Sequence, residues 1–179
     1  MTSLGKLFVA ASAAAFLSAA GAASAATFTV QAINDIPSWL DTGIDLQAGQ
    51  TYDFTVNNPA TLWSAGSDIP FPRTSTADGI DPAFYGQFSF GNLTANFGAL
   101  VGEVGGQFFL IGTNATETGL SGDLKVGYWD SFYPDNSGSQ SLSISAVPEP
   151  AAWAMMLVGF GGLGAAIRSN RRKDAVAAA

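Results

Sequence analysis

The chain has 179 residues, of which 47% are hydrophobic and 12% charged, and its formal net charge is −7. It contains no cysteine and no histidine, which excludes disulfides, a Ser-His-Asp triad, a cysteine nucleophile and an ordinary zinc site. Twelve acidic and only two basic residues lie within residues 27–147. A surface this acidic repels phosphate backbones and suits hard cations, so we expect no nucleic-acid partner.

The N-terminus has the pattern of a secretory signal peptide. Lys6 precedes an apolar stretch over residues 7–17, and Ala23-Ser24-Ala25 forms an A-x-A cleavage pattern. The apolar stretch is too short for a membrane anchor, which is the alternative interpretation. We therefore expect residues 1–26 to be a signal peptide that directs export through the Sec machinery.

Residues 27–147 predict one all-β domain. Apolar and polar residues alternate in four runs, which is typical of strands with one buried face. These runs are Phe28 to Ala32, Tyr52 to Val56, Leu124 to Tyr128, and Leu142 to Ile144. Gly105-Gly106 predicts a hairpin turn between candidate strands over 98–104 and 107–111. No segment has a helical stripe, so the pattern favours a β-sandwich or jelly roll.

Two loops of this domain are candidates for the functional site. Residues 57–84 contain four prolines and little alternation, and they predict a long loop of the kind that often carries function. The segment 128–138 follows one strand and precedes another, and Asp130, Asp135 and Asn136 place three oxygen-bearing side chains within it. Such residues suit Ca²⁺, which takes six to eight oxygen ligands. They also form ordinary turns, and spacing alone favours a plain turn over a calcium site.

Three stretches of the domain agree with a known family in their order and spacing. They are Trp39 to Gln50, Gly98 to Gly102, and the 128–138 segment with its continuation to Ile144. Together they make the domain similar to the PA-IL-like family of small galactose-binding lectins. The resemblance implies a jelly-roll β-sandwich with one calcium ion per subunit, completed by two sugar hydroxyls.

The resemblance also implies which residues act. It gives Asp130, Asp135 and Asn136 as side-chain ligands of calcium, and Trp63 and Phe132 as backbone carbonyl ligands. The family's sugar-contacting histidine has no counterpart, because the chain has none. Four residues are then candidate sugar contacts: Asp78 and Asp81 through hydrogen bonds, and Trp129 and Tyr133 through their rings. The alternative for the two aromatic residues is a place in the core.

The C-terminal segment has three parts in order. Pro148-Glu149-Pro150 comes first, an apolar run from Trp153 to Ile167 follows, and a basic cluster begins at Arg168. This order resembles the PEP-CTERM sorting segment in its PEPxxWA variant. The resemblance implies a Gram-negative bacterium, processing by an exosortase, and a surface or matrix location. We expect a sorting segment over 148–173 whose helix enters the inner membrane transiently, and a disordered tail over 174–179; a buried core helix is the alternative.

These observations predict an exported, surface- or matrix-associated protein with a calcium-dependent carbohydrate-binding module. The alternative is a structural exopolysaccharide or biofilm matrix protein with no sugar site. We do not expect an enzyme. Twelve acidic residues make some carboxylate pair inevitable, so such a pair is no evidence for a glycosidase.

Overall fold

The computed structural model describes residues 25–34, 36, 38–66, 73–131, 134–148 and 150–177. Most of the expected signal peptide, part of the long loop, and the residues Phe132, Tyr133 and Glu149 lie outside this range.

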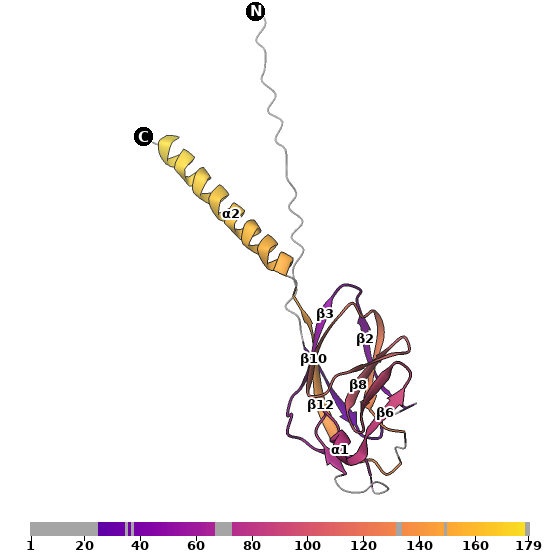
Figure 1. Ribbon diagram of the computed structural model, residues 1–179. Helices are drawn as coiled ribbons and strands as arrows, with labels where there is room; N and C mark the ends of the chain where they lie inside the picture. Colours follow the sequence, from indigo (N-terminus) through magenta and orange to yellow (C-terminus); the bar gives the residue numbers. More distant parts are fainter. Residues whose placement is uncertain are drawn as a thin grey trace, which may run out of the picture.

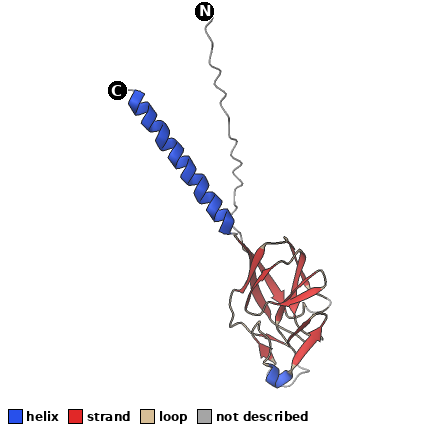
Figure 2. Cartoon of the chain, turned by 45° about the horizontal axis from the view of Figure 1, so that its top comes forward, coloured by secondary structure: helices blue, strands red, loops and turns tan. Residues whose placement is uncertain are grey.

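The domain consists of two antiparallel four-stranded sheets packed face to face (Figures 1 and 2). The first sheet has the order β1 (Ala26–Gln31), β12 (Ser139–Val147), β3 (Thr51–Val56), β10 (Asn114–Thr118). The second has the order β2 (Leu40–Leu46), β11 (Gly122–Tyr128), β8 (Leu100–Val104), β9 (Gln107–Leu110). Two short pairs complete the domain: β4 (Trp63–Ser64) with β5 (Thr74–Ser75), and β6 (Gln87–Phe90) with β7 (Leu93–Asn96).

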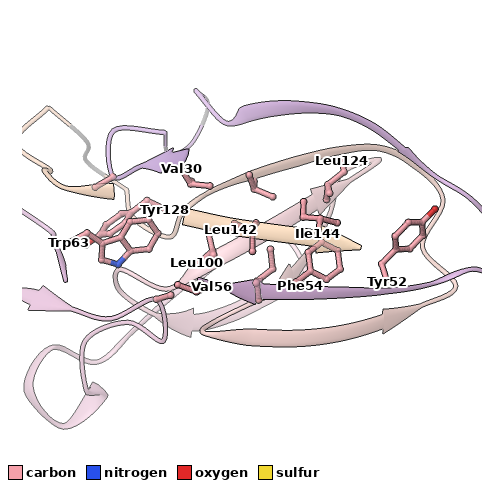
Figure 3. Close-up of a cluster of buried hydrophobic side chains, with 14 of the residues drawn as sticks. Val30, Tyr52, Phe54, Val56, Trp63, Leu100, Leu124, Tyr128, Leu142 and Ile144 are labelled. Atoms are coloured by element: carbon pink, nitrogen blue, oxygen red, sulfur yellow. The ribbon is translucent and has the colours of Figure 1, made fainter. Parts of the chain in front are cut away.

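The predicted alternation decides which side chains fill the space between the sheets. Val30, Phe54, Leu124, Leu142 and Ile144 are buried there, and their sequence neighbours on the strands point outward. The core runs from Tyr52 at one end to Trp63 and Tyr128 at the other (Figure 3). The expected all-β sandwich is therefore confirmed.

The hairpin signal is also confirmed. Val104 pairs with Gln107, and the two glycines between them have φ values of 59° and 81°. Two successive positive φ values are those of the tight turn that connects strands most readily, and glycine adopts them without strain. The strand β8 begins at Leu100 rather than at residue 98, because Gly98 and Ala99 belong to a turn and an isolated bridge.

A second, smaller core lies on the outer face of the β2-β11-β8-β9 sheet. Val101 and Trp129 are buried there with Ala95 and Ala99, away from the main core. The β6–β7 hairpin covers them and contributes Phe88. Just before this hairpin, the long loop ends in a short helix, α1 (Pro82–Tyr85), which the sequence did not predict.

Two residues separate the C-terminal helix α2 (Pro150–Ala177) from β12, and the helix leads away from the sandwich (Figures 1 and 2). Its described apolar side chains are exposed, as Leu157 (74%) and Phe160 (65%) illustrate, so this helix is not the core helix of the alternative. The helix continues to Ala177, which corrects the expected disorder over residues 174–177. Within the described residues, no helix is long and apolar enough to cross a membrane.

The two ends of the sandwich differ in what they carry. β12 ends at Val147, opposite Thr51 of β3, and we call this the tail-proximal end. β12 begins at Ser139, opposite Gln31 of β1, and we call this the distal end. The segment 129–138 therefore lies at the distal end, away from helix α2.

Candidate metal site at the distal end

Asp130 and Asn136 meet in the buried part of the 129–138 segment. Each is only 6% exposed. The Asn136 side-chain nitrogen Nδ2 donates to Asp130 Oδ2 and to the backbone carbonyl of Ala32, at 3.2 Å in both cases. Two residues that the sequence predicted as ligands are thus brought together, beside the residue that follows β1.

These two hydrogen bonds fix the orientation of the Asn136 amide. The opposite orientation would set its oxygen against two acceptors, so Nδ2 must face Ala32 and Asp130. The remaining oxygen, Oδ1, is buried and has no hydrogen-bond partner among the described residues. A buried amide oxygen left in this state costs about 1–3 kcal/mol, and a bound cation would remove that cost.

Asp135, the residue before Asn136, contacts the long loop. Its carboxyl group lies where a Cβ atom at Gly66 would be, and Gly66 has a φ of +84°. Nearby, the backbones of Ser64 and Ser137 exchange both hydrogen bonds, at 2.8 and 3.1 Å. Residues 64–66 and 135–137 are therefore held side by side. Sequence reasoning missed Gly66, for which the one signal was a glycine three residues after Trp63.

Trp63 lies beneath this contact. Its indole nitrogen donates to the carbonyl oxygen of Gly98 at 2.8 Å, and its ring packs edge-on against Tyr128 with a centroid distance of 4.6 Å (Figure 3). Successive carbonyls of a strand point in opposite directions, and that of Ser64 faces Ser137. The carbonyl of Trp63 therefore faces the β5 side, and it is Gly66 that contacts Asp135.

The hydroxyl of Tyr128 is affected by burial and by the charges of the candidate ligands. It is buried and has no hydrogen-bond partner within the part of the chain that the structure describes. Burial first, and then the carboxylates of Asp130 and Asp135, raise the pKa of this phenol well above its ordinary value of 10.0. Burial and the two carboxylates thus all favour the protonated phenol.

The candidate ligands of this segment are all oxygens. Two carboxylates, one amide oxygen and nearby backbone carbonyls are the ligand types that Ca²⁺ accepts in irregular loops. No group of three or more His, Cys, Asp or Glu residues that could hold a metal is found in the described chain, so acidic residues alone do not form the site. The residues present fit calcium because the amide of Asn136 supplies the third side-chain oxygen.

The candidate sugar contacts Asp78 and Asp81 hold local structure. Asp78 Oδ1 accepts from the backbone nitrogen of Thr113 at 2.7 Å, and its Oδ2 accepts from the Thr113 hydroxyl at 3.3 Å. Asp81 is the N-cap of α1 and accepts from the backbone nitrogen of Ala83 at 2.9 Å. Each carboxylate already has a structural role before any sugar is considered.

The two aromatic candidates have different outcomes. Trp129 is fully buried, and its indole nitrogen donates to the carbonyl oxygen of Phe88 at 2.8 Å. Its ring packs against Phe88 and Phe108, at centroid distances of 5.3 and 5.7 Å. This favours the core alternative for Trp129, because a sugar cannot reach a buried ring. Tyr133 and the predicted carbonyl ligand Phe132 lie outside the described residues.

The residues predicted as a sorting motif lie at the other end of the domain. Pro148 follows the last residue of β12, and Pro150 is the first residue of α2, where proline fits because its backbone nitrogen needs no partner. Trp153 and Arg168 lie on α2, with Arg168 exposed. Glu149 and the side chain of Trp153 are outside the described part.

Comparison with known proteins agrees with the description of the sorting segment and with that of the β-sandwich. Residues 146–173 match the PEP-CTERM protein-sorting motif, so the chain carries that motif. No curated protein sequence matches the chain. A solved structure described as "EclA N-terminal domain; PllA-like lectin" is similar, with a TM-score of 0.52 and 21% sequence identity, over 68% of this chain and 95% of that chain. At this identity the similarity establishes the fold, a lectin-like β-sandwich.

Proposed function

We propose that the protein is an exported carbohydrate-binding protein of the cell surface or extracellular matrix, and that its jelly-roll-like sandwich over residues 27–147 uses one calcium ion. The sorting motif indicates export and processing by an exosortase. The lectin-like fold supports binding rather than catalysis. Before processing, the sorting segment holds the chain transiently at the inner membrane.

One observation carries the calcium proposal. The oxygen Oδ1 of Asn136 is buried without a partner in the described structure, in an orientation fixed by two hydrogen bonds, beside the carboxylate of Asp130. A plain turn, which the spacing alone favoured, gives no reason to keep such an oxygen in this state. A role as a cation ligand gives such a reason.

The residues that would hold the ion are Asp130, Asp135 and Asn136 through side chains, with a backbone oxygen from Phe132. The carbonyl of Trp63, the other predicted ligand, faces β5 and would reach the ion only if the β4 backbone turned. The calcium ion would offset the two negative charges and offer open coordination positions to the hydroxyls of a sugar. Tyr133 is the remaining aromatic candidate for the apolar face of that sugar. Asp78 and Asp81 would contact that sugar only with carboxylates that already accept hydrogen bonds within the protein.

Calcium titration of the exported chain tests this proposal. Thermal unfolding and calorimetry with Ca²⁺, and with Mg²⁺ for comparison, should show stabilisation by Ca²⁺. Asp130→Asn keeps the size of the side chain and removes its charge, and we expect at least a tenfold loss of calcium affinity. Asp123→Asn removes a charge from an exposed strand position and should leave the affinity unchanged. A wild-type chain that shows no heat and no shift in melting temperature would refute the proposal.

A structural matrix protein without a sugar site is the second candidate function. Two observations favour it. The chain has no histidine to contact a sugar, and the carboxylates of Asp78 and Asp81 accept hydrogen bonds from the backbone. A glycan array in the presence of Ca²⁺, repeated with a chelator, separates the two functions. Binding that needs calcium supports the lectin, and silence under both conditions supports the matrix protein.

A further inference from the structure

The sorting motif begins inside the folded domain. Its match starts at residue 146, and Ala146 and Val147 are the last two residues of β12, paired with Tyr52 and Thr51 of β3. Helix α2 starts at Pro150. Three Cα–Cα steps therefore separate the sheet from the helix, which is at most about 11 Å.

The end of β12 is also held in place from the neighbouring turn. The side-chain nitrogen of Gln50 donates to the carbonyl oxygen of Val147 at 2.6 Å and to that of Thr51 at 3.0 Å. The hydroxyls of Thr51 and Thr118 are bonded to each other at 2.8 Å, which ties the next strand to the same end. An enzyme that acts on the sorting segment therefore meets a closed sheet end rather than a loose linker.

Three turns form this tail-proximal end, as the strand register shows. They are residues 47–50, 105–106 and 119–121. None of them contains a charged residue, and four of their nine residues are glycine, so few side chains project. Four carboxylates flank the turns on the strands. Asp45 accepts from the side chain of Gln47 and Glu103 accepts from the backbone of Gly106, while Glu117 and Asp123 lie two residues from the 119–121 turn.

The distal end is different. Asp78, Asp81, Asp130 and Asp135 all lie there, in a domain whose acidic residues outnumber the basic ones sixfold. The lack of charge is therefore a property of the three turns themselves and not of the strand ends that flank them.

We propose that the three turns at the tail-proximal end form a contact surface for the enzyme that processes the sorting segment. Because the sheet ends within about 11 Å of α2, an enzyme that engages the start of the segment, at residues 148–150, lies against these turns. Turns that have few projecting side chains and no charge of their own permit this approach, whereas the distal end does not adjoin the segment. This inference rests on the proposed sorting by an exosortase and adds a partner-facing role for the sandwich itself.

Two exposed alanines give a matched test in a host that carries a sorting enzyme for this motif. Ala48 lies in the 47–50 turn, and Ala60 lies in a loop at the distal end. We expect Ala48→Glu to slow removal of the tail at least fivefold and Ala60→Glu to leave the rate unchanged, as followed by mass spectrometry of the chain. An eight-residue Gly/Ser insertion between Val147 and Pro148 should restore the rate in Ala48→Glu, because it moves the segment away from the turns.

The melting temperature of each purified variant shows that it is folded, and Ser121→Glu, in the exposed 119–121 turn, is a second variant in case Ala48→Glu does not fold. Equal processing rates for the tail-proximal and distal variants would overturn the contact surface alone. A wild-type chain that keeps its tail in that host would overturn the exosortase sorting and this inference together. Neither result bears on the calcium site, which the titration tests separately.

Discussion

The carboxyl group of Asp135 occupies the space that a Cβ atom of residue 66 would need, so Gly66 and Asp135 can adjoin only because residue 66 has no side chain. Gly66 follows β4, and Asp135 belongs to the loop between β11 and β12. The contact thus joins the long loop to the loop with the candidate ligands.

Gly66→Ala should therefore weaken the candidate site beyond its effect on the backbone. Gly49 is the matched control, because its φ of +83° is nearly that of Gly66 (+84°) and nothing lies within 4 Å of the added Cβ. We expect both substitutions to lower the free energy of unfolding by about 1 kcal/mol through backbone strain. Gly66→Ala should cost about 1–3 kcal/mol more and reduce calcium affinity. Chemical denaturation and calcium titration check this, and equal losses in the two variants would contradict it.

Asn136→Asp should make stability depend strongly on calcium. The substitution removes the two hydrogen bonds from Nδ2 and places a third carboxylate next to Asp130 and Asp135. We expect the free energy of unfolding to fall by about 2–4 kcal/mol in the presence of a chelator. Saturating Ca²⁺ should restore much of the loss, because binding to the folded state stabilises it.

The control for this substitution is Asn58→Asp, which adds the same charge at an exposed position of the distal end. It should change stability by less than about 0.5 kcal/mol with or without calcium. If Asn136→Asp loses the same stability in chelator and in Ca²⁺, then Asn136 has only a structural role.

Tyr128 should make the folded state sensitive to alkaline pH. Its phenol pKa is raised above 10.0 in the folded chain, so the folded state keeps a proton that the unfolded state releases above about pH 10. Stability from this group is fully present below pH 10 and falls as pH rises further, by up to about 1.4 kcal/mol per pH unit. Tyr128→Phe should flatten this decline in denaturation curves recorded between pH 9 and 11.

The same variant has a second expected result at neutral pH. Because the described residues give the Tyr128 hydroxyl no hydrogen bond, its removal should be neutral or slightly stabilising. Tyr85→Phe, at a partly exposed ring on α1, is the matched tyrosine-to-phenylalanine control at pH 7. A large loss of stability in Tyr128→Phe at pH 7 would show that the hydroxyl has a partner.

Trp129→Phe distinguishes a core residue from a sugar-stacking one. It removes the hydrogen bond to the carbonyl oxygen of Phe88 and leaves a void in the second core. We expect the free energy of unfolding to fall by about 2–4 kcal/mol, with sugar and calcium affinity unchanged. Trp39→Phe, at a partly exposed position in the same cluster, should cost less. Unfolding curves and binding titrations of the two variants decide between the roles.

Much of the fold could be predicted from the sequence because period-two alternation is a local property. It identified the strands around Val30, Phe54, Leu124 and Leu142, and the Gly105-Gly106 dipeptide identified the hairpin between β8 and β9. The alternation also places Trp129 on the outer face, one residue after the inward-facing Tyr128. What it could not show is that the β6–β7 hairpin covers that face and makes a second core of it.

The sequence by itself determined the sorting motif, the all-β character of residues 27–147 and the exclusion of histidine and cysteine chemistry, because each follows from which residues are present and in what local order. Only the tertiary structure decided that the Asn136 amide is fixed between Ala32 and Asp130 and that Gly66 adjoins Asp135. These contacts join segments far apart in the chain. Their geometry depends on how two sheets pack and which turns meet at one end, and no local pattern encodes that.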